Sequence, residues 1–186
     1  MWAKMSGPLL ALFSFAAYQL AFRVNALISP WFEYAPGVSL VFIPAGVKLI
    51  ALLVAGWWGL AGLALAALLM ASDVWSQAGW PDLVGNILVW LGVPFIVVEL
   101  SIRWLNVRRD LKNLTFLKFA LIASVATLIG GLASAKYAVE VHDQSMKDLV
   151  AVSLAMALGD MIGIGLMMIL VLGVLSLIER LRPNRR

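Results

Sequence analysis

Six long apolar runs, separated by short polar or aromatic connections, limit what this chain can fold into. A helix needs about 20 apolar residues to cross the hydrocarbon core of a bilayer. The runs predict membrane-spanning helices at residues 8–29, 38–56, 59–75, 84–105, 115–135 and 149–178. Apolar residues make up 63% of the chain and charged residues 13%, whereas a soluble domain has about half and about a quarter. We therefore expect a single all-α polytopic membrane domain over residues 1–186.

The positive charges lie beside these spans. With six spans, the two chain ends share one side of the membrane with the Trp57–Trp58 connection and the 106–114 loop. That side holds Lys4, the basic residues from Arg108 to Lys118 and the arginine-rich tail. Cytoplasmic connections of membrane proteins carry an excess of Lys and Arg. We therefore predict cytoplasmic termini, and the net charge of +4 requires no nucleic-acid partner.

Motifs for most enzyme chemistry are absent from the sequence. There is no cysteine, which excludes disulfides, thiolate metal sites and cysteine nucleophiles. No phosphate-binding loop, dinucleotide-binding fingerprint or zinc-protease helix motif occurs. The single histidine, His142, falls near Glu140 and Asp143, and a solvated outer loop explains this group better than a metal site. The sequence thus predicts no catalytic residue, no metal, no cofactor and no enzymatic activity.

Two opposite charges lie inside the predicted spans at a similar depth. Lys48 is about ten residues, and Asp160 about twelve, from the outer ends of their spans, at ~1.5 Å of rise per residue. A lone charge at that depth is costly unless it is paired. We expect Lys48 and Asp160 to approach each other or to share a polar cavity near the midplane. The pair is either an ion bridge that fixes helix packing or a ligand or proton site, and both alternatives stay open.

Further polar and helix-breaking residues surround this predicted site. Glu99 and Asn86 are secondary candidates for the polar core of this site. For Glu99 the alternative is a pair with Arg103, which follows it by four residues, a spacing at which two side chains can pair on one helix face. Asn86 is predicted to hydrogen-bond a neighbouring helix, with a place in the lining of the cavity as the alternative. Pro44 and Pro94 interrupt the backbone hydrogen bonding of two spans, which predicts kinks or gaps that a binding site can use.

Three short patterns occur in a defined order along the chain. The first is Phe42–Val47, followed by an apolar run, a glycine–tryptophan turn and a helix of small residues. The second is Gly85–Asn86, and the third is Gly159–Gly163 with Asp160 in it. In this order they resemble MASE1, an integral-membrane sensory domain of bacteria, over residues 38–105 and 155–178. The resemblance implies that the family-like positions are Pro44, Gly46, Asn86, Gly159, Asp160 and Gly163.

The resemblance implies a multi-pass sensory protein of the bacterial inner membrane. Members of this family usually precede a cytoplasmic output domain, such as a diguanylate cyclase or a histidine kinase. Because this chain stops just after its last span, we expect a sensory or ligand-binding protein that acts through a partner protein or a second copy. Its other partners would be the lipid bilayer and a small-molecule ligand. Two alternatives are a small-molecule transporter or importer substrate-binding subunit, and a structural subunit of a membrane protein complex.

Overall fold

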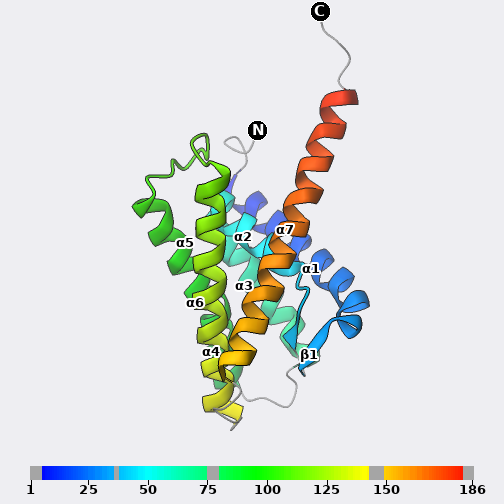
Figure 1. Cartoon of the computed structure of the whole chain (residues 1–186), viewed down its shortest axis with the longest axis vertical. Helices are drawn as coiled ribbons and strands as arrows, with labels where there is room; N and C mark the ends of the chain where they lie inside the picture. Colours follow the sequence, from blue (N-terminus) through cyan, green and yellow to red (C-terminus); the bar gives the residue numbers. More distant parts are fainter. Residues whose placement is uncertain (1–5, 36–37, 75–79, 143–148, 182–186) are drawn as a thin grey trace, which may run out of the picture.

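The computed structural model (Figure 1) describes residues 6–35, 38–74, 80–142 and 149–181, and these are mostly helical. The α-helices are α1 (Gly7–Ile28), α2 (Pro44–Ala55), α3 (Trp57–Val74), α4 (Trp80–Ile87), α5 (Val93–Trp104), α6 (Phe116–His142) and α7 (Leu149–Leu181). The connection from α1 to α2 contains a 3₁₀ turn, η2 (Ser29–Trp31), and two strands, β1 (Glu33–Ala35) and β2 (Val38–Ser39). A π-helical segment, η3 (Leu88–Gly92), joins α4 to α5.

Four stretches of the described chain are helices long and apolar enough to cross a membrane. They are Gly7–Trp31, Pro81–Trp104, Phe116–Tyr137 and Leu149–Ile178. Their outward faces carry exposed apolar side chains such as Leu27 and Ile169, as expected where hydrocarbon replaces water. The chain is therefore an all-α, multi-pass membrane protein, as the composition predicts.

The span predicted over residues 38–56 is interrupted at its proline, and only its second part is a helix. Residues 38–43 form a non-helical segment, here called the strap, and α2 begins only at Pro44. A proline fixes φ in the helical range but has no N–H, so it fits the first turn of a helix and breaks a helix interior. Pro44 therefore starts α2 in the middle of the apolar run.

The turn between α2 and α3 is also placed differently from the prediction. It is formed by Gly56, and Trp57 and Trp58 already belong to α3. Gly56 has a φ of 54°, a left-handed conformation that glycine adopts without the steric cost of a side chain. One glycine thus reverses the chain, and the two tryptophans stand 71% and 49% exposed at this end of the bundle.

The fourth predicted span, 84–105, is interrupted as its proline predicts. The π-helical segment η3 ends at Gly92, just before Pro94 near the start of α5. In an α-helix the ring of Pro94 would clash with the carbonyl of residue 90, and the wider turn avoids this. The chain thereby continues across the membrane with a local irregularity at mid-span.

The two ends of the bundle can be identified from contacts. At one end, Gly7 packs against the ring of Trp58, and the Gly56 turn lies beside Glu99 and Arg109. At the opposite end, the Tyr137 hydroxyl donates a 2.9 Å hydrogen bond to the Asp82 carbonyl. Figure 1 shows the end of α7 on the same side as the loop between α5 and α6.

The strand connection lies at the other side of the molecule from the Gly56 turn. β1 pairs antiparallel with β2, with Glu33 opposite Ser39. The aromatic side chains before and within β1 are exposed, as a place at a membrane interface requires. They are Trp31, Phe32 and Tyr34.

Candidate functional site

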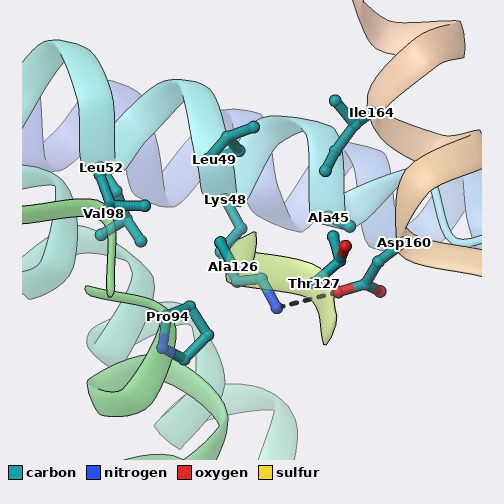
Figure 2. A pocket seen from close by; sticks show the side chains of 10 residues that line it. All are labelled: Ala45, Lys48, Leu49, Leu52, Pro94, Val98, Ala126, Thr127, Asp160 and Ile164. Atoms are coloured by element: carbon teal, nitrogen blue, oxygen red, sulfur yellow. Dashed lines mark hydrogen bonds and ion pairs between the residues drawn. The ribbon is translucent and has the colours of Figure 1, made fainter. Parts of the chain in front are cut away.

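Lys48 and Asp160 meet in the interior of the bundle, so their predicted approach is confirmed. The Lys48 Nζ lies 3.5 Å from the Asp160 Oδ2, and 112 residues separate the two positions in the sequence. The Lys48 side chain is 7% exposed and the Asp160 side chain 20%. Figure 2 shows the lysine extending from α2 and the carboxylate from α7.

Three glycines hold α7 against the strap and α2. A Cβ on Gly159 would overlap the Ser39 carbonyl oxygen, and one on Gly163 would overlap the Phe42 carbonyl oxygen. A Cβ on Gly46 would overlap the Met167 side chain. Since these neighbours are mostly backbone atoms, which cannot move aside cheaply, the close approach requires glycine. This seam sets the distance between the elements that carry Lys48 and Asp160.

The backbone of the strap is satisfied by groups from two other helices. The Phe42 N–H donates a 3.1 Å hydrogen bond to the Gly159 carbonyl of α7. The Ile43 N–H donates a 2.9 Å bond to the Asn25 Oδ1 of α1, and Asn25 is buried. Non-helical backbone at membrane depth is tolerated where protein satisfies its polar groups in this way. This role of Asn25 was not predicted from the sequence, where its only signal is an amide inside an apolar run.

A small cavity adjoins the ion pair. Its walls come from α2, α5, α6 and α7, and they include Pro94, Val98, Thr127 and Ile164. Figure 2 shows Lys48 and Asp160 at this cavity, with Thr127 beside them. The space open to the centre of a water-sized sphere is ≈ 10 Å³, which is about the minimum for one water. In this conformation the cavity is too small for an organic solute.

Two aromatic side chains complete the surroundings of the ammonium. The Lys48 Nζ lies 4.8 Å from the centroid of the Trp90 ring, a distance typical of a cation–π contact. The Tyr18 ring meets Trp90 edge to face, with centroids 5.6 Å apart, and Tyr18 is 1% exposed. Trp90 belongs to η3, so the irregular turn before Pro94 supplies a wall of the site. Neither aromatic residue was predicted from the sequence to belong to the site.

Inside the protein, the charge on Lys48 and the charge on Asp160 each depend on the other for stabilisation. Two unit charges 3.5 Å apart attract by about 5 kcal/mol at an effective dielectric constant of 20. Removing both from water costs a comparable amount, whereas removing only one leaves an uncompensated charge inside the protein. The pair can therefore hold α2 against α7, and any ligand or proton that neutralises one partner would weaken that contact.

Glu99 is not part of this site, and its predicted partner is wrong. Its two carboxylate oxygens accept hydrogen bonds of 2.9 and 2.5 Å from Arg109, while Arg103 is exposed. The loop after α5 folds back and presents the two-pronged guanidinium of Arg109, which matches a carboxylate better than one flexible side chain along a helix. These hydrogen bonds raise the pKa of Arg109. The Glu99–Arg109 pair closes the Gly56 end of the bundle.

Asn86 also lies away from the site. It is half-buried on α4 and does not belong to the lining of the cavity. Its neighbour Gly85 lies against the Tyr137 hydroxyl, near the opposite end of the bundle from Glu99. The alternative in which Asn86 lines the cavity is therefore wrong. In the sequence, His142 lies near Glu140 and Asp143, and Asp143 lies outside the described residues.

Comparison of the chain with protein-family models, curated proteins and solved structures gives no match.

Proposed function

We propose that this chain is a MASE1-like sensory protein of the bacterial inner membrane. It would cross the membrane six times with both termini in the cytoplasm, bind a small ligand at the intramembrane polar site and relay this to a partner. The observation that carries the proposal is the Lys48–Asp160 pair beside a cavity, at a point where two spans lose regular helical structure. Ionisable groups at this depth are usually functional.

The lengths of the strap, α2 and α3 support the six-span arrangement. The strap has six residues and α2 has twelve, so together they reach about 38 Å at ~3.3 Å per extended and ~1.5 Å per helical residue. That exceeds the ~30 Å hydrocarbon core. α3, with 18 residues, extends for about 27 Å back to the other side. With the four longer stretches this makes six crossings, and it puts the basic 106–114 loop and the end of α7 on one side.

The size of the cavity limits what the site can bind without rearrangement. A space for one water fits a proton or a single water, and a larger ligand requires α2, α5 and α7 to separate. Such a separation would break the ion pair, which gives ligand binding a direct effect on helix packing. A sensor requires a coupling of this kind between its ligand and a change of conformation.

A transporter or importer subunit is the second candidate, and the irregular backbone favours it. Substrate sites of transporters often lie where helices are interrupted near the midplane, and here the strap precedes α2 and η3 precedes α5. That function would require a cavity that opens to both sides in turn. A measurement of solute uptake distinguishes the two functions. A transporter loses solute uptake with Asp160→Asn although the protein remains folded, whereas a sensor takes up no solute.

Distance measurements by pulsed electron resonance test the sensory proposal. Because the chain has no cysteine, Trp104→Cys on α5 and Leu170→Cys on α7 give one spin-label pair. Both positions are more than half exposed, at 79% and 58%. In nanodiscs, Asp160→Asn is expected to shift the label distance by about 1–2 Å or more, as coupled helix movements do.

Two further variants make this test decisive. Thr127→Val alters the cavity wall without removing a charge, so it is expected to shift the distance in part while the protein folds normally. Glu99→Gln, at the end of the bundle, is the control and should leave the distance unchanged. If Asp160→Asn and Thr127→Val both preserve the wild-type distance in folded protein, the pair is a static structural bridge and the sensory proposal fails.

A further inference from the structure

Arg103 is an exposed cation on the lipid-facing side of α5. Ile96 and Leu100, four positions apart, are 57% and 59% exposed, so they mark the side of the helix that faces hydrocarbon. Arg103 follows Leu100 by three positions and Ile96 by seven, which places it on that same side. Within the described residues it forms no ion pair, because the carboxylate of Glu99 is bonded to Arg109.

Lys118 has the corresponding position at the start of α6. Leu121 and Val125, four positions apart, are 42% and 39% exposed and mark the outward side of this helix. Lys118 precedes Leu121 by three positions and Val125 by seven, so it lies on the same side. It is half-buried and forms no ion pair in the part of the chain that the structure describes. Two lipid-facing cations without a counter-charge thus flank the loop between α5 and α6.

Arg103 and Lys118 lie at a similar height on two helices that pack together. A Cβ on Gly130 of α6 would lie 3.2 Å from the Pro94 ring of α5, which fixes the level of one helix against the other. Arg103 is nine residues beyond Pro94 and therefore level with Leu121, and Lys118 is three residues farther toward the same end. This difference in height is about 4.5 Å at 1.5 Å per residue. Since packed helices lie about 8–10 Å apart, the two long side chains can reach one small anion.

The two cations lie where the spans leave the hydrocarbon. The apolar stretch that contains α5 ends at Trp104, and the one that contains α6 begins at Phe116. Both aromatic side chains are exposed, and aromatic residues at the ends of spans mark the headgroup level. Arg103 and Lys118 are next to these residues in the sequence. The anions found at this level of a bilayer are the phosphates of phospholipids.

We propose that Arg103 and Lys118 together bind the phosphate of one anionic phospholipid. The guanidinium can donate two parallel hydrogen bonds to a phosphate, and the ammonium adds a point charge. A zwitterionic headgroup would bring a positive charge of its own close to both side chains, so an anionic headgroup is preferred. The acyl chains of the same lipid would lie against the exposed apolar sides of α5 and α6, a contact that free phosphate does not make.

The basic loop between the two helices is arranged differently. Its cations Arg108 and Lys112 lie 3.1 and 3.9 Å from the Oδ2 of Asp110, and they belong to neither helix. The loop is held in shape by the Asn113 side chain, whose Oδ1 accepts a 2.8 Å hydrogen bond from the Arg108 N–H. Arg108 and Lys112 thus have a carboxylate partner and no place on a lipid-facing helix side. They provide a control with the same total charge.

Native mass spectrometry of the full chain tests the lipid site. Purified protein in detergent micelles is titrated with dioleoyl phosphatidylglycerol, which is anionic, or with dioleoyl phosphatidylcholine, which is zwitterionic. The first phosphatidylglycerol is expected to bind about tenfold more tightly than the first phosphatidylcholine. Arg103→Gln/Lys118→Gln should reduce this preference to less than about twofold, and Arg103→Gln alone should reduce it in part. Arg108→Gln/Lys112→Gln removes the same charge and should preserve the preference.

Three results would overturn the proposal. One is an equal loss of the preference in the two paired glutamine variants, because the lipid would then respond to overall charge. Another is a preference that survives both Arg103→Gln and Arg103→Gln/Lys118→Gln in protein that circular dichroism shows to be folded. The third is displacement of phosphatidylglycerol by millimolar inorganic phosphate, which would make the site one for free phosphate. None of these variants touches Lys48 or Asp160, so the result is independent of the sensory proposal.

Discussion

The Ile43 N–H donates a 2.9 Å hydrogen bond to the Oδ1 of Asn25, a buried side chain on α1. Ile43 is the residue before α2, where the helix supplies no partner for backbone N–H groups. The Asn25 amide therefore accepts the hydrogen bond that a water molecule would accept at a helix start on the surface of a soluble protein. It also ties the strap to α1, while the Gly159 carbonyl ties it to α7.

Replacing this amide should destabilise the fold. Asn25→Leu keeps the approximate volume but leaves the Ile43 N–H without its partner, so the free energy of unfolding should fall by about 1–3 kcal/mol. Thermal unfolding in detergent micelles measures this. Gln19→Leu on the same helix is the control, since the Gln19 amide makes only a 3.4 Å bond to the Ala66 carbonyl. An equal loss from both substitutions would mean that the Asn25–Ile43 bond has no special role.

The glycine seam predicts a difference between glycines on one helix. Gly163→Ala should lower the free energy of unfolding by about 1–3 kcal/mol, because its methyl group would overlap the Phe42 carbonyl. Gly165→Ala is the matched control, since a Cβ there meets no atom within 4 Å. Alanine should stabilise the helix at that position by up to about 1 kcal/mol. Unfolding curves of the two variants in the same micelle should move in opposite directions, and movement in the same direction would contradict the packing described.

The ion pair predicts strong coupling between two substitutions. Lys48→Met alone should lower the free energy of unfolding by about 3–5 kcal/mol, because it leaves the Asp160 carboxylate without a counter-charge. The double variant Lys48→Met/Asp160→Leu should recover most of that loss, since two apolar side chains need no pairing. A double-mutant cycle measures the coupling. Additive losses in the cycle would show that the two groups do not depend on each other.

The Glu99–Arg109 pair predicts a smaller, salt-dependent effect. Its guanidinium is 60% exposed, and exposed pairs contribute about 0.2–1 kcal/mol. Arg109→Ala should therefore lower the free energy of unfolding by up to about 1 kcal/mol, and less at 1 M salt, where the screening length is about 3 Å. Arg103→Ala should change it by less than about 0.5 kcal/mol. A larger effect from Arg103 than from Arg109 would restore the pairing that sequence spacing suggests.

The sequence by itself determined that lipid surrounds the chain, that the fold is all-α and that Lys48 meets Asp160. Long apolar runs leave few structures that satisfy the backbone in lipid, and two opposite charges at one depth are costly apart. These constraints act on composition and position along the chain, so they can be recognised without coordinates. The sequence also indicates that a helix starts at Pro44, because proline has no backbone N–H in any fold.

Only the tertiary structure decided the partners that come from distant segments. Arg109 rather than Arg103 bonds Glu99 because the loop after α5 folds back, and helical spacing contains no information about that loop. Asn25 reaches the strap because α1 packs beside α2, and Trp90 of η3 reaches the Lys48 ammonium with Tyr18 against its ring. Asn86 does not belong to the lining of the cavity. Periodicity fixes the direction of a side chain within its own helix. The rotation and depth of each helix against its neighbours depend on close contacts such as the Gly163–Phe42 seam, which exist only after the chain has packed.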